Sequence, residues 1–250
     1  MATERGKIQW EHFKANLIKM GLDFQLRPKI LELGSGKGEL CLSAIEAGFD
    51  CFGLEVDSNI YDSSRLLFLE NNNQYHEKYL FLYDGDHIPF PASFFDASIS
   101  FYVIEHIKDI GVVLREITRC LKSGGLVYFR WQDPKIFYEG HANIPWLPFM
   151  PKYIINLWCN EFNIDEQKRN YILNYCYNNT IENVSGILSF LGWEILEFSP
   201  VPECLIPFHY EYETESEIRS LVKNIRKKIE NGEWPNSPNQ QFPYLKARKM

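Results

Sequence analysis

Long apolar segments are missing from this sequence of 250 residues. No run approaches the roughly 18 apolar residues that a membrane-spanning helix needs. Residues Met1 to Gln9 contain no apolar stretch typical of a signal peptide. These absences predict a cytoplasmic protein without membrane insertion. No repeat, low-complexity tract or Gly/Ser linker divides the chain, so we expect one domain, residues 1–250, that carries an insertion.

The sequence also lacks an excess of basic residues. The chain has 33 acidic and 26 basic residues, a net charge of -7. Because general nucleic-acid binders normally present a basic face, we expect no nucleic-acid partner. The cysteines show neither a C-x-x-C pair nor a zinc-type spacing, which predicts reduced thiols and no metal site. They are Cys41, Cys51, Cys120, Cys159, Cys176 and Cys204.

Short apolar runs alternate with helical stripes through the first half of the chain. A leader helix is expected at about residues 4–20, and further helices at about 38–47, 59–70 and 109–121. Between them, five strands are expected at Lys29–Leu33, Asp50–Glu55, Tyr79–Tyr83, Ala97–Phe101 and Leu126–Trp131. Such alternation implies right-handed crossovers and a parallel sheet that is covered on both faces.

The alternation fails in the middle and then resumes. Residues 133–178 are rich in aromatics and proline, and they predict helices but no clear strand. A helix at about 180–191, a strand at 194–198, a charged amphipathic helix and a last strand at Phe242–Arg248 follow. The predicted fold is therefore α/β and Rossmann-like, a doubly wound, mostly parallel seven-stranded sheet with a helical lid inserted after the fifth strand. We expect the basic residues of the amphipathic helix to form a solvated face; they are Lys223, Arg226, Lys227 and Lys228.

A glycine-rich turn follows the first expected strand, in the segment Glu32-Leu33-Gly34-Ser35-Gly36-Lys37-Gly38. Glycine lets the backbone approach a ligand that any Cβ would obstruct. Open α/β sheets bind ligands at this carboxyl end of their strands. The second expected strand ends in Glu55, whose carboxylate can accept hydrogen bonds from both hydroxyls of a ribose. The two features together indicate a nucleoside-containing cofactor.

The spacing of the glycines distinguishes between two candidate cofactors. In the dinucleotide fingerprint G-x-G-x-x-G, the pyrophosphate lies against a helix N-terminus. Here Gly38 comes one residue early, Glu39 takes the usual position of the third glycine, and Glu32 precedes the turn. A carboxylate repels a pyrophosphate but suits a cationic amino acid, which favours S-adenosylmethionine over NAD. A nicotinamide-dependent oxidoreductase and a binding protein without turnover remain the alternatives.

Five ordered motifs resemble those of one enzyme family. They are Glu32-x-Gly34-x-Gly36-x-Gly38, Gly53-Leu54-Glu55, Asp84–Phe90 with Phe95-Asp96, Val103–Ile107 and Arg119–Gly125. The set is similar to class I S-adenosylmethionine-dependent methyltransferases, in their UbiE-like or methyltransferase type 11 branch. The resemblance covers residues 29–131 and implies a methyltransferase fold, methyl-transfer activity and S-adenosylmethionine as the methyl donor.

The resemblance also assigns residues to the parts of the cofactor. Glu32, Gly34 and Gly36, with Ser35 between the glycines, would surround the methionine portion, and Glu55 would bind the ribose. Asp84 and the Gly85 backbone would meet the adenine amine, while Phe101 and Tyr102 would flank the sulfonium. Asp57 stands where the family often has serine, and we interpret it as a helix cap.

The acceptor is expected to be a small molecule or a saccharide. His141 titrates near neutrality and lies at the mouth of the expected lid, so it is the candidate catalytic base or acceptor ligand. The stretch from His141 to Trp146 resembles a segment found in methyltransferases of saccharide-modifying pathways. Glu105 and His106 are interpreted as residues that cap or pack the following helix. The oligomeric state does not follow from the sequence.

Overall fold

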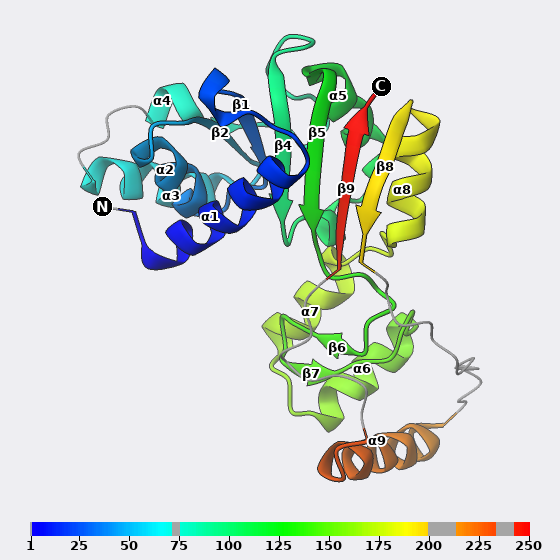
Figure 1. Cartoon of the computed structure of the whole chain (residues 1–250). Coiled ribbons are helices and arrows are strands. Elements are labelled where there is room, and N and C mark those ends of the chain that lie inside the picture. Colours follow the sequence, from blue (N-terminus) through cyan, green and yellow to red (C-terminus); the bar gives the residue numbers. More distant parts are fainter. Residues whose placement is uncertain (1, 72–75, 200–213, 234–242) are drawn as a thin grey trace.

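The computed structural model describes residues 2–71, 76–199, 214–233 and 243–250. Its centre is a seven-stranded sheet in the order β3-β2-β1-β4-β5-β9-β8 (Figure 1). The first five strands in the chain pair in parallel, and only β9 runs antiparallel to its neighbours β5 and β8. The predicted fold class is therefore confirmed. The strands are β1 (Lys29–Leu33), β2 (Asp50–Glu55), β3 (Leu80–Leu82), β4 (Phe95–Phe101), β5 (Leu121–Arg130), β8 (Trp193–Phe198) and β9 (Tyr244–Lys249).

Helices cover both faces of the sheet, which buries the central strands as continuous apolar runs. Helix α1 packs on α2 and also contacts β5, whereas α5 packs on α8. The leader helix, predicted from Trp10, Phe13 and Leu17, is confirmed, since these three side chains are buried in the main core. The flanking helices are α1 (Glu4–Lys19), α2 (Glu39–Glu46), α3 (Ser58–Glu70), α4 (His76–Tyr79), α5 (Ile110–Cys120) and α8 (Ile181–Phe190).

Several boundaries differ from those predicted. Strand β3 is shorter than the expected 79–83, because α4 occupies the chain up to Tyr79. Strand β5 begins at Leu121, directly after α5. The last strand runs to Lys249, and Phe242, where we expected it to begin, lies outside the described residues. The cap assigned to Asp57 is confirmed, since its carboxylate accepts the N–H groups of Asn59 and Ile60 at the start of α3.

A second group of elements lies beyond the carboxyl ends of the parallel strands, as the arrowheads of β4 and β5 in Figure 1 show. We call it the accessory lobe. It consists of β6 (Tyr138–Glu139), β7 (Ile144–Pro145), α6 (Lys152–Glu161), α7 (Glu166–Tyr175) and α9 (Glu215–Glu230). The antiparallel pair β6–β7 contradicts the expectation of no strand in this region. Two-residue strands are too short to produce a readable alternation of apolar and polar residues.

The accessory lobe has its own hydrophobic core, and α9 completes it. Ile218 and Val222 of α9 are buried in the same cluster as Trp158 of α6. This helix lies outside the range 133–178 that the sequence indicated. Arg226 donates a hydrogen bond to the carbonyl of Glu161 and lies 4.8 Å from the ring centre of Phe162. The predicted solvated face is confirmed, since Lys223, Arg226, Lys227 and Lys228 are all exposed, and Arg226 makes these contacts from the solvent side.

The described cysteines are all free thiols, as predicted, and Cys204 lies outside the described residues. Four of the five are buried, and Cys176 is partly exposed. Among the described helices, none is both long enough and apolar enough to cross a membrane.

The contact between α1 and α2 yields a test of the fold. A Cβ on Gly6 would lie 2.3 Å from the carbonyl oxygen of Glu39 and 2.7 Å from the Ser43 hydroxyl. We expect Gly6→Ala to destabilise the protein by about 1–3 kcal/mol through this overpacking. Gly186 in α8 is the matched control, because a Cβ there meets no atom within 4 Å. Gly186→Ala is expected to stabilise the protein by about 0.5–1 kcal/mol, the ordinary helix preference for alanine. Urea unfolding of both variants decides the point, and a stabilising Gly6→Ala would contradict the packing.

Candidate active site

The glycine turn after β1 combines one tightly packed glycine with one open glycine. Gly34 and Gly36 both adopt left-handed backbone, with φ of 70° and 53°. A Cβ on Gly34 would lie 2.2 Å from the side chain of Val103, so this position has no room for another residue. A Cβ on Gly36 would meet nothing within 4 Å. The backbone at Gly36 therefore faces open space that a ligand can approach.

Glu55 fastens this turn to the end of β2. One carboxylate oxygen accepts the Gly36 N–H at 2.9 Å, and the other accepts the N–H groups of Val56 and Asp57 at 2.8 and 3.0 Å. The side chain is 7% exposed. A carboxylate has about four acceptor positions. Glu55 therefore retains capacity for a further donor beside the glycine turn.

Two buried polar atoms at the turn have no hydrogen-bond partner among the described residues: Oε2 of Glu32 and Oγ of Ser35. Burial raises the pKa of Glu32 well above its usual range, and the charge of Glu55 adds to the increase. A backbone hydrogen bond from Cys41 lowers this pKa, but by less. Buried polar groups in proteins nearly always have partners. These two atoms therefore fit a polar ligand that supplies donors at this place.

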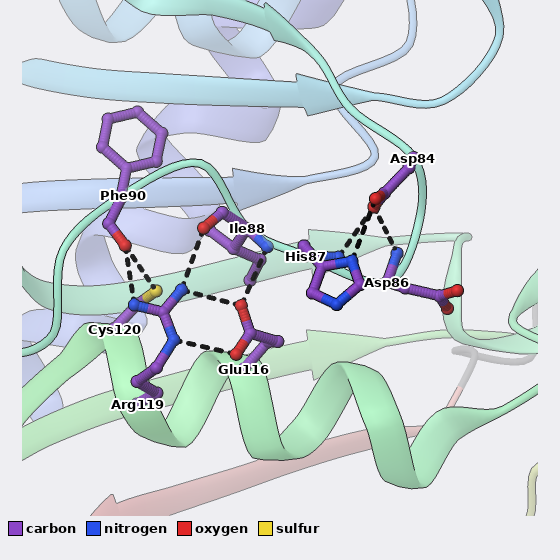
Figure 2. A network of polar contacts seen from close by, with 8 residues as sticks. All are labelled: Asp84, Asp86, His87, Ile88, Phe90, Glu116, Arg119 and Cys120. Carbon is purple, nitrogen blue, oxygen red and sulfur yellow. Dashed lines mark hydrogen bonds and ion pairs between the residues drawn. The ribbon is translucent and has the colours of Figure 1, made fainter.

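The Asp84 carboxylate makes its hydrogen bonds within its own loop (Figure 2). Its carboxylate accepts the N–H of His87 at 2.7 Å and that of Asp86 at 2.8 Å, and it pairs with the His87 ring at 3.0 Å. The backbone hydrogen bond from His87, then its side-chain hydrogen bond, lowers the pKa of Asp84 to about 2. The side chain is exposed, and its assignment to the adenine amine stays a prediction. Gly85 has φ of 92° and lies beside Val56, so this loop borders the one after Glu55.

The segment after this loop is held to α5 by an ion pair, also shown in Figure 2. Arg119 pairs with Glu116 at 2.7 Å and donates to the carbonyls of Phe90 and Ile88. Glu116 in turn accepts the N–H of Ile88 at 2.9 Å. These contacts fix the chain between β3 and β4, and with it the direction in which the Asp84 loop leaves the sheet.

Phe101 and Tyr102 lie where β4 ends. Their rings are in contact, with centroids 4.0 Å apart. Tyr102 has a φ of 58°, a conformation that is uncommon for a residue other than glycine. Its N–H donates to the carbonyl of Arg130 at 2.9 Å, which holds this turn on β5. Phe101 also contacts Phe13 and Arg130, so it belongs partly to the core.

His141 lies in the turn between β6 and β7, against the sheet edge. Its Nδ1 is 2.5 Å from Oε1 of Glu139, and its Nε2 is 3.3 Å from Nε2 of His106. Burial opposes protonation of His141, but the hydrogen bond and charge of Glu139 raise its pKa overall. Glu105, beside His106, has one carboxylate oxygen without a partner among the described residues, and burial raises its pKa to about 7.

A small, partly open cavity lies between the sheet edge and the accessory lobe. It is lined by polar groups from both parts and by apolar side chains of the lobe. The polar members are Glu105, Gln132, Glu139, His141, Cys176, Tyr177 and Asn178. The apolar members are Pro134, Trp146, Phe149, Met150, Ile155 and Ile172.

The interpretation of Glu105 or His106 as a cap of the next helix is wrong, and their structural packing role stays a prediction. Asp109 caps α5 by accepting the N–H of Val112, whereas Glu105 lines the cavity and His106 contacts His141. The signal available in the sequence was the position of Glu105 and His106 just after the fourth expected strand, at the sheet edge over which the lid was expected. Glu139 and Cys176 are also brought to this place, and sequence reasoning did not assign Cys176 to the site. The structure thus groups Glu32, Ser35, Gly36 and Glu55 at one place on the edge and His141 with new partners at another.

Comparison with known proteins identifies the domain. Residues 31–129 match the family described as "Methyltransferase domain". The match covers less than half of the chain, and the fold around it is that of class I methyltransferases. This enzyme therefore carries a methyltransferase domain, and S-adenosylmethionine is its cofactor.

Solved structures with the same fold are distant in sequence. An S-adenosylmethionine-dependent methyltransferase from Mesorhizobium loti is 17% identical with a TM-score of 0.54, over 89% of this chain and 91% of that one. A methyltransferase from Aquifex aeolicus is 11% identical with a TM-score of 0.54, over 95% and 89%. Geranyl diphosphate methyltransferase in complex with S-adenosylmethionine is 12% identical with a TM-score of 0.53, over 89% and 78%. Among curated proteins, no sequence matches the enzyme.

The raised pKa of Glu32 predicts how stability depends on pH. A carboxyl group whose pKa is higher in the folded state favours folding below its unfolded pKa, and this contribution is lost as the pH rises through the folded pKa. Glu32 faces the Glu55 carboxylate and the Cys41 and Cys51 thiols, which leave its charge uncompensated in the cofactor-free protein. We therefore expect Glu32→Gln to gain stability relative to wild type as the pH rises from about 5 to 8. Urea unfolding without cofactor measures this difference, and a difference that stays constant with pH contradicts it.

Proposed function

We propose that the enzyme transfers a methyl group from S-adenosylmethionine to a small-molecule or saccharide acceptor bound in the cavity beside His141. The acceptor's nucleophilic atom attacks the methyl carbon in line with the breaking carbon–sulfur bond. S-adenosylhomocysteine leaves with the electron pair, and the acceptor gives up its proton. Placing the two reactants in this geometry supplies most of the rate enhancement.

The glycine turn is the proposed place of the methionine portion. The observation that carries this proposal is the pair of unpartnered buried atoms, Glu32 Oε2 and Ser35 Oγ, beside the open backbone at Gly36. An ammonium group would supply donors to a carboxylate that burial otherwise disfavours. Glu55 would use its remaining acceptor capacity for the ribose, and the Asp84–Gly85 loop would border the adenine. Phe101 and Tyr102 would lie at the sulfonium side.

The charge of the cavity supports a neutral or cationic acceptor. Glu105 and Glu139 line it, and its described lining contains neither Lys nor Arg. A diphosphate or carboxylate acceptor would meet two carboxylates here with no lysine or arginine in the described lining to compensate them. Trp146 and Phe149 provide aromatic surface for a sugar or a planar ring, and His141 would act on the acceptor from the same wall.

We further propose that the accessory lobe serves as the lid of a single-domain enzyme, with α9 as part of it. The lobe lies at the carboxyl edge of the sheet, and its elements close one side of the cavity. The net charge of -7 supports an acceptor that is not a nucleic acid. The free thiols of the described cysteines support a cytoplasmic enzyme.

Calorimetric titration with S-adenosylmethionine and, separately, with NADH tests the cofactor site. We expect saturable binding of the first and none of the second. Release of S-adenosylhomocysteine with matched amine, sugar and diphosphate acceptors then tests the acceptor class. Turnover with the diphosphate alone would contradict the charge argument, and binding of NADH alone would contradict the methyltransferase site.

Glu55→Ala tests the ribose contact. We expect this variant to weaken S-adenosylmethionine binding by about 1.5–3 kcal/mol, the cost of losing hydrogen bonds to a charged group. Asp57→Ala is the matched control, because Asp57 caps α3 and its loss should cost about 1 kcal/mol of stability without changing the dissociation constant. If both variants bind the cofactor as wild type does, the ribose assignment is wrong.

A further inference from the structure

Two histidine rings from different parts of the fold meet at the cavity. His106 ends a short 3-10 turn, Ile104–His106, that follows β4, and His141 belongs to the accessory lobe. Their Nε2 atoms are 3.3 Å apart, and the ring planes cross at 66°. The edge of each ring that carries Nε2 therefore points toward the other.

The remaining nitrogen of each ring is already bound to an acceptor. Nδ1 of His106 lies 2.7 Å from the carbonyl oxygen of Tyr175, which can only accept, so the ring proton is on Nδ1. Nδ1 of His141 lies 2.5 Å from a carboxylate oxygen of Glu139. That oxygen also accepts the backbone N–H of His141, and the second oxygen accepts the Gln132 amide. In neutral rings held this way, both Nε2 atoms carry lone pairs directed at the same place.

The hydroxyl of Tyr171 lies 3.3 Å from Nε2 of His106 and can donate to that one nitrogen. An electropositive partner between the two rings would satisfy both Nε2 atoms at once. Zinc–nitrogen bonds of about 2.0–2.1 Å at a tetrahedral angle place two nitrogens about 3.3–3.4 Å apart, which matches the distance here. Zinc-binding histidines also donate their other ring N–H to a carboxylate or a backbone carbonyl, which fixes the tautomer and the ring orientation. Glu139 and the carbonyl of Tyr175 form these two anchors.

A third donor and the local charge suit the same ion. The sulfur of Cys176 and nitrogens of His106 and His141 all lie within 4.8 Å of one another. The sulfur lies 4.0 Å from Nδ1 of His106. A sulfur and a nitrogen on one zinc are about 3.5 Å apart, so the Cys176 side chain has to turn toward the two Nε2 atoms to complete the set. Glu105 and Glu139 supply negative charge in a cavity whose described lining has neither Lys nor Arg. Imidazole with thiolate is a ligand set that favours zinc over magnesium or calcium.

We propose that His106, His141 and Cys176 bind one Zn²⁺ ion and leave its fourth position open to the cavity. Glu139 is then a positioning residue that acts through His141. Three protein ligands with one open position are the arrangement of catalytic rather than structural zinc sites. The role of the ion at the acceptor rests on the proposed function. With Nδ1 on Glu139 and Nε2 on zinc, His141 would act on the acceptor only through the ion, which supplies a Lewis acid beside the acceptor group that loses its proton. This proposal replaces the sequence-based prediction of no metal site, which considered only local spacings.

The test uses the full-length protein, stripped with a chelator and titrated with ZnCl₂ against a chromophoric competitor. We expect one ion per chain in wild type and binding at least 100-fold weaker in His106→Gln and His141→Gln. Glu139→Gln should weaken binding about 10–100-fold, as loss of an outer-shell partner does. His12→Gln is the control, because His12 hydrogen-bonds Tyr128 and lies outside the cluster; its zinc affinity should equal that of wild type.

Titration with CoCl₂ identifies the third ligand. A thiolate-to-cobalt charge-transfer band is expected in wild type and should vanish in Cys176→Ser, while Cys159→Ser, a buried cysteine of α6, should retain it. Thermal unfolding of every variant separates loss of a ligand from loss of the fold. A wild-type protein that binds no zinc would overturn the proposal and leave a shared proton between the two rings. Zinc binding that survives both histidine variants would overturn it as well.

The two proposals fail in different measurements. Titration of the stripped protein with S-adenosylmethionine reports only on the glycine turn and Glu55. If it binds the methyl donor but no zinc, this inference fails and the proposed function stands. If the stripped protein binds zinc but no methyl donor, the proposed function fails and the zinc inference stands.

Discussion

The parallel pairing of β1 with β2 on one side and β4 on the other is the constraint from which the site follows. Parallel strands end at the same edge of a sheet, so the glycine turn, Glu55 and the Phe101–Tyr102 turn must converge. The edge is then locked by Glu55, which binds the Gly36 N–H across the gap between two loops. A buried carboxylate that accepts three N–H groups needs no cation beside it, because those donors compensate its desolvation.

The same edge holds two kinds of buried carboxylate. Glu55 is satisfied by backbone donors, whereas Glu32 and Glu105 each have one oxygen without a described partner. Burial raises the pKa of both, to about 7 for Glu105. Unsatisfied groups of this sort are costly in a fold and are usually kept where a ligand completes them. One lies at the proposed methyl donor and the other in the proposed acceptor cavity, so the two halves of the reaction would share a single edge.

The accessory lobe differs from the sheet in the way it is stabilised. Its core joins α6 and α7 to α9, an element that enters from much later in the chain. Arg226 reinforces this contact through the end of α6 and the ring of Phe162. The lobe contributes His141, Glu139 and Cys176 to the cavity, while the sheet edge contributes Glu105 and His106. The chemistry of the cavity therefore depends on how the lobe is seated on the sheet.

The sequence by itself determined the alternation of strands and helices up to β5, the glycine turn, Glu55 and the Asp57 cap. Each of these can be predicted from a local pattern: apolar runs, glycine spacing and a polar residue before a helix. It also indicated the enzyme family through motifs confined to residues 31–129. The tertiary structure alone decided that β6 and β7 pair, that α9 joins the lobe, and that His106 meets His141. These contacts join residues from separate segments of the chain, and no periodicity or fixed spacing in the sequence predicts them. They form because burying the apolar faces of the lobe brings its polar loops against the carboxyl edge of the sheet.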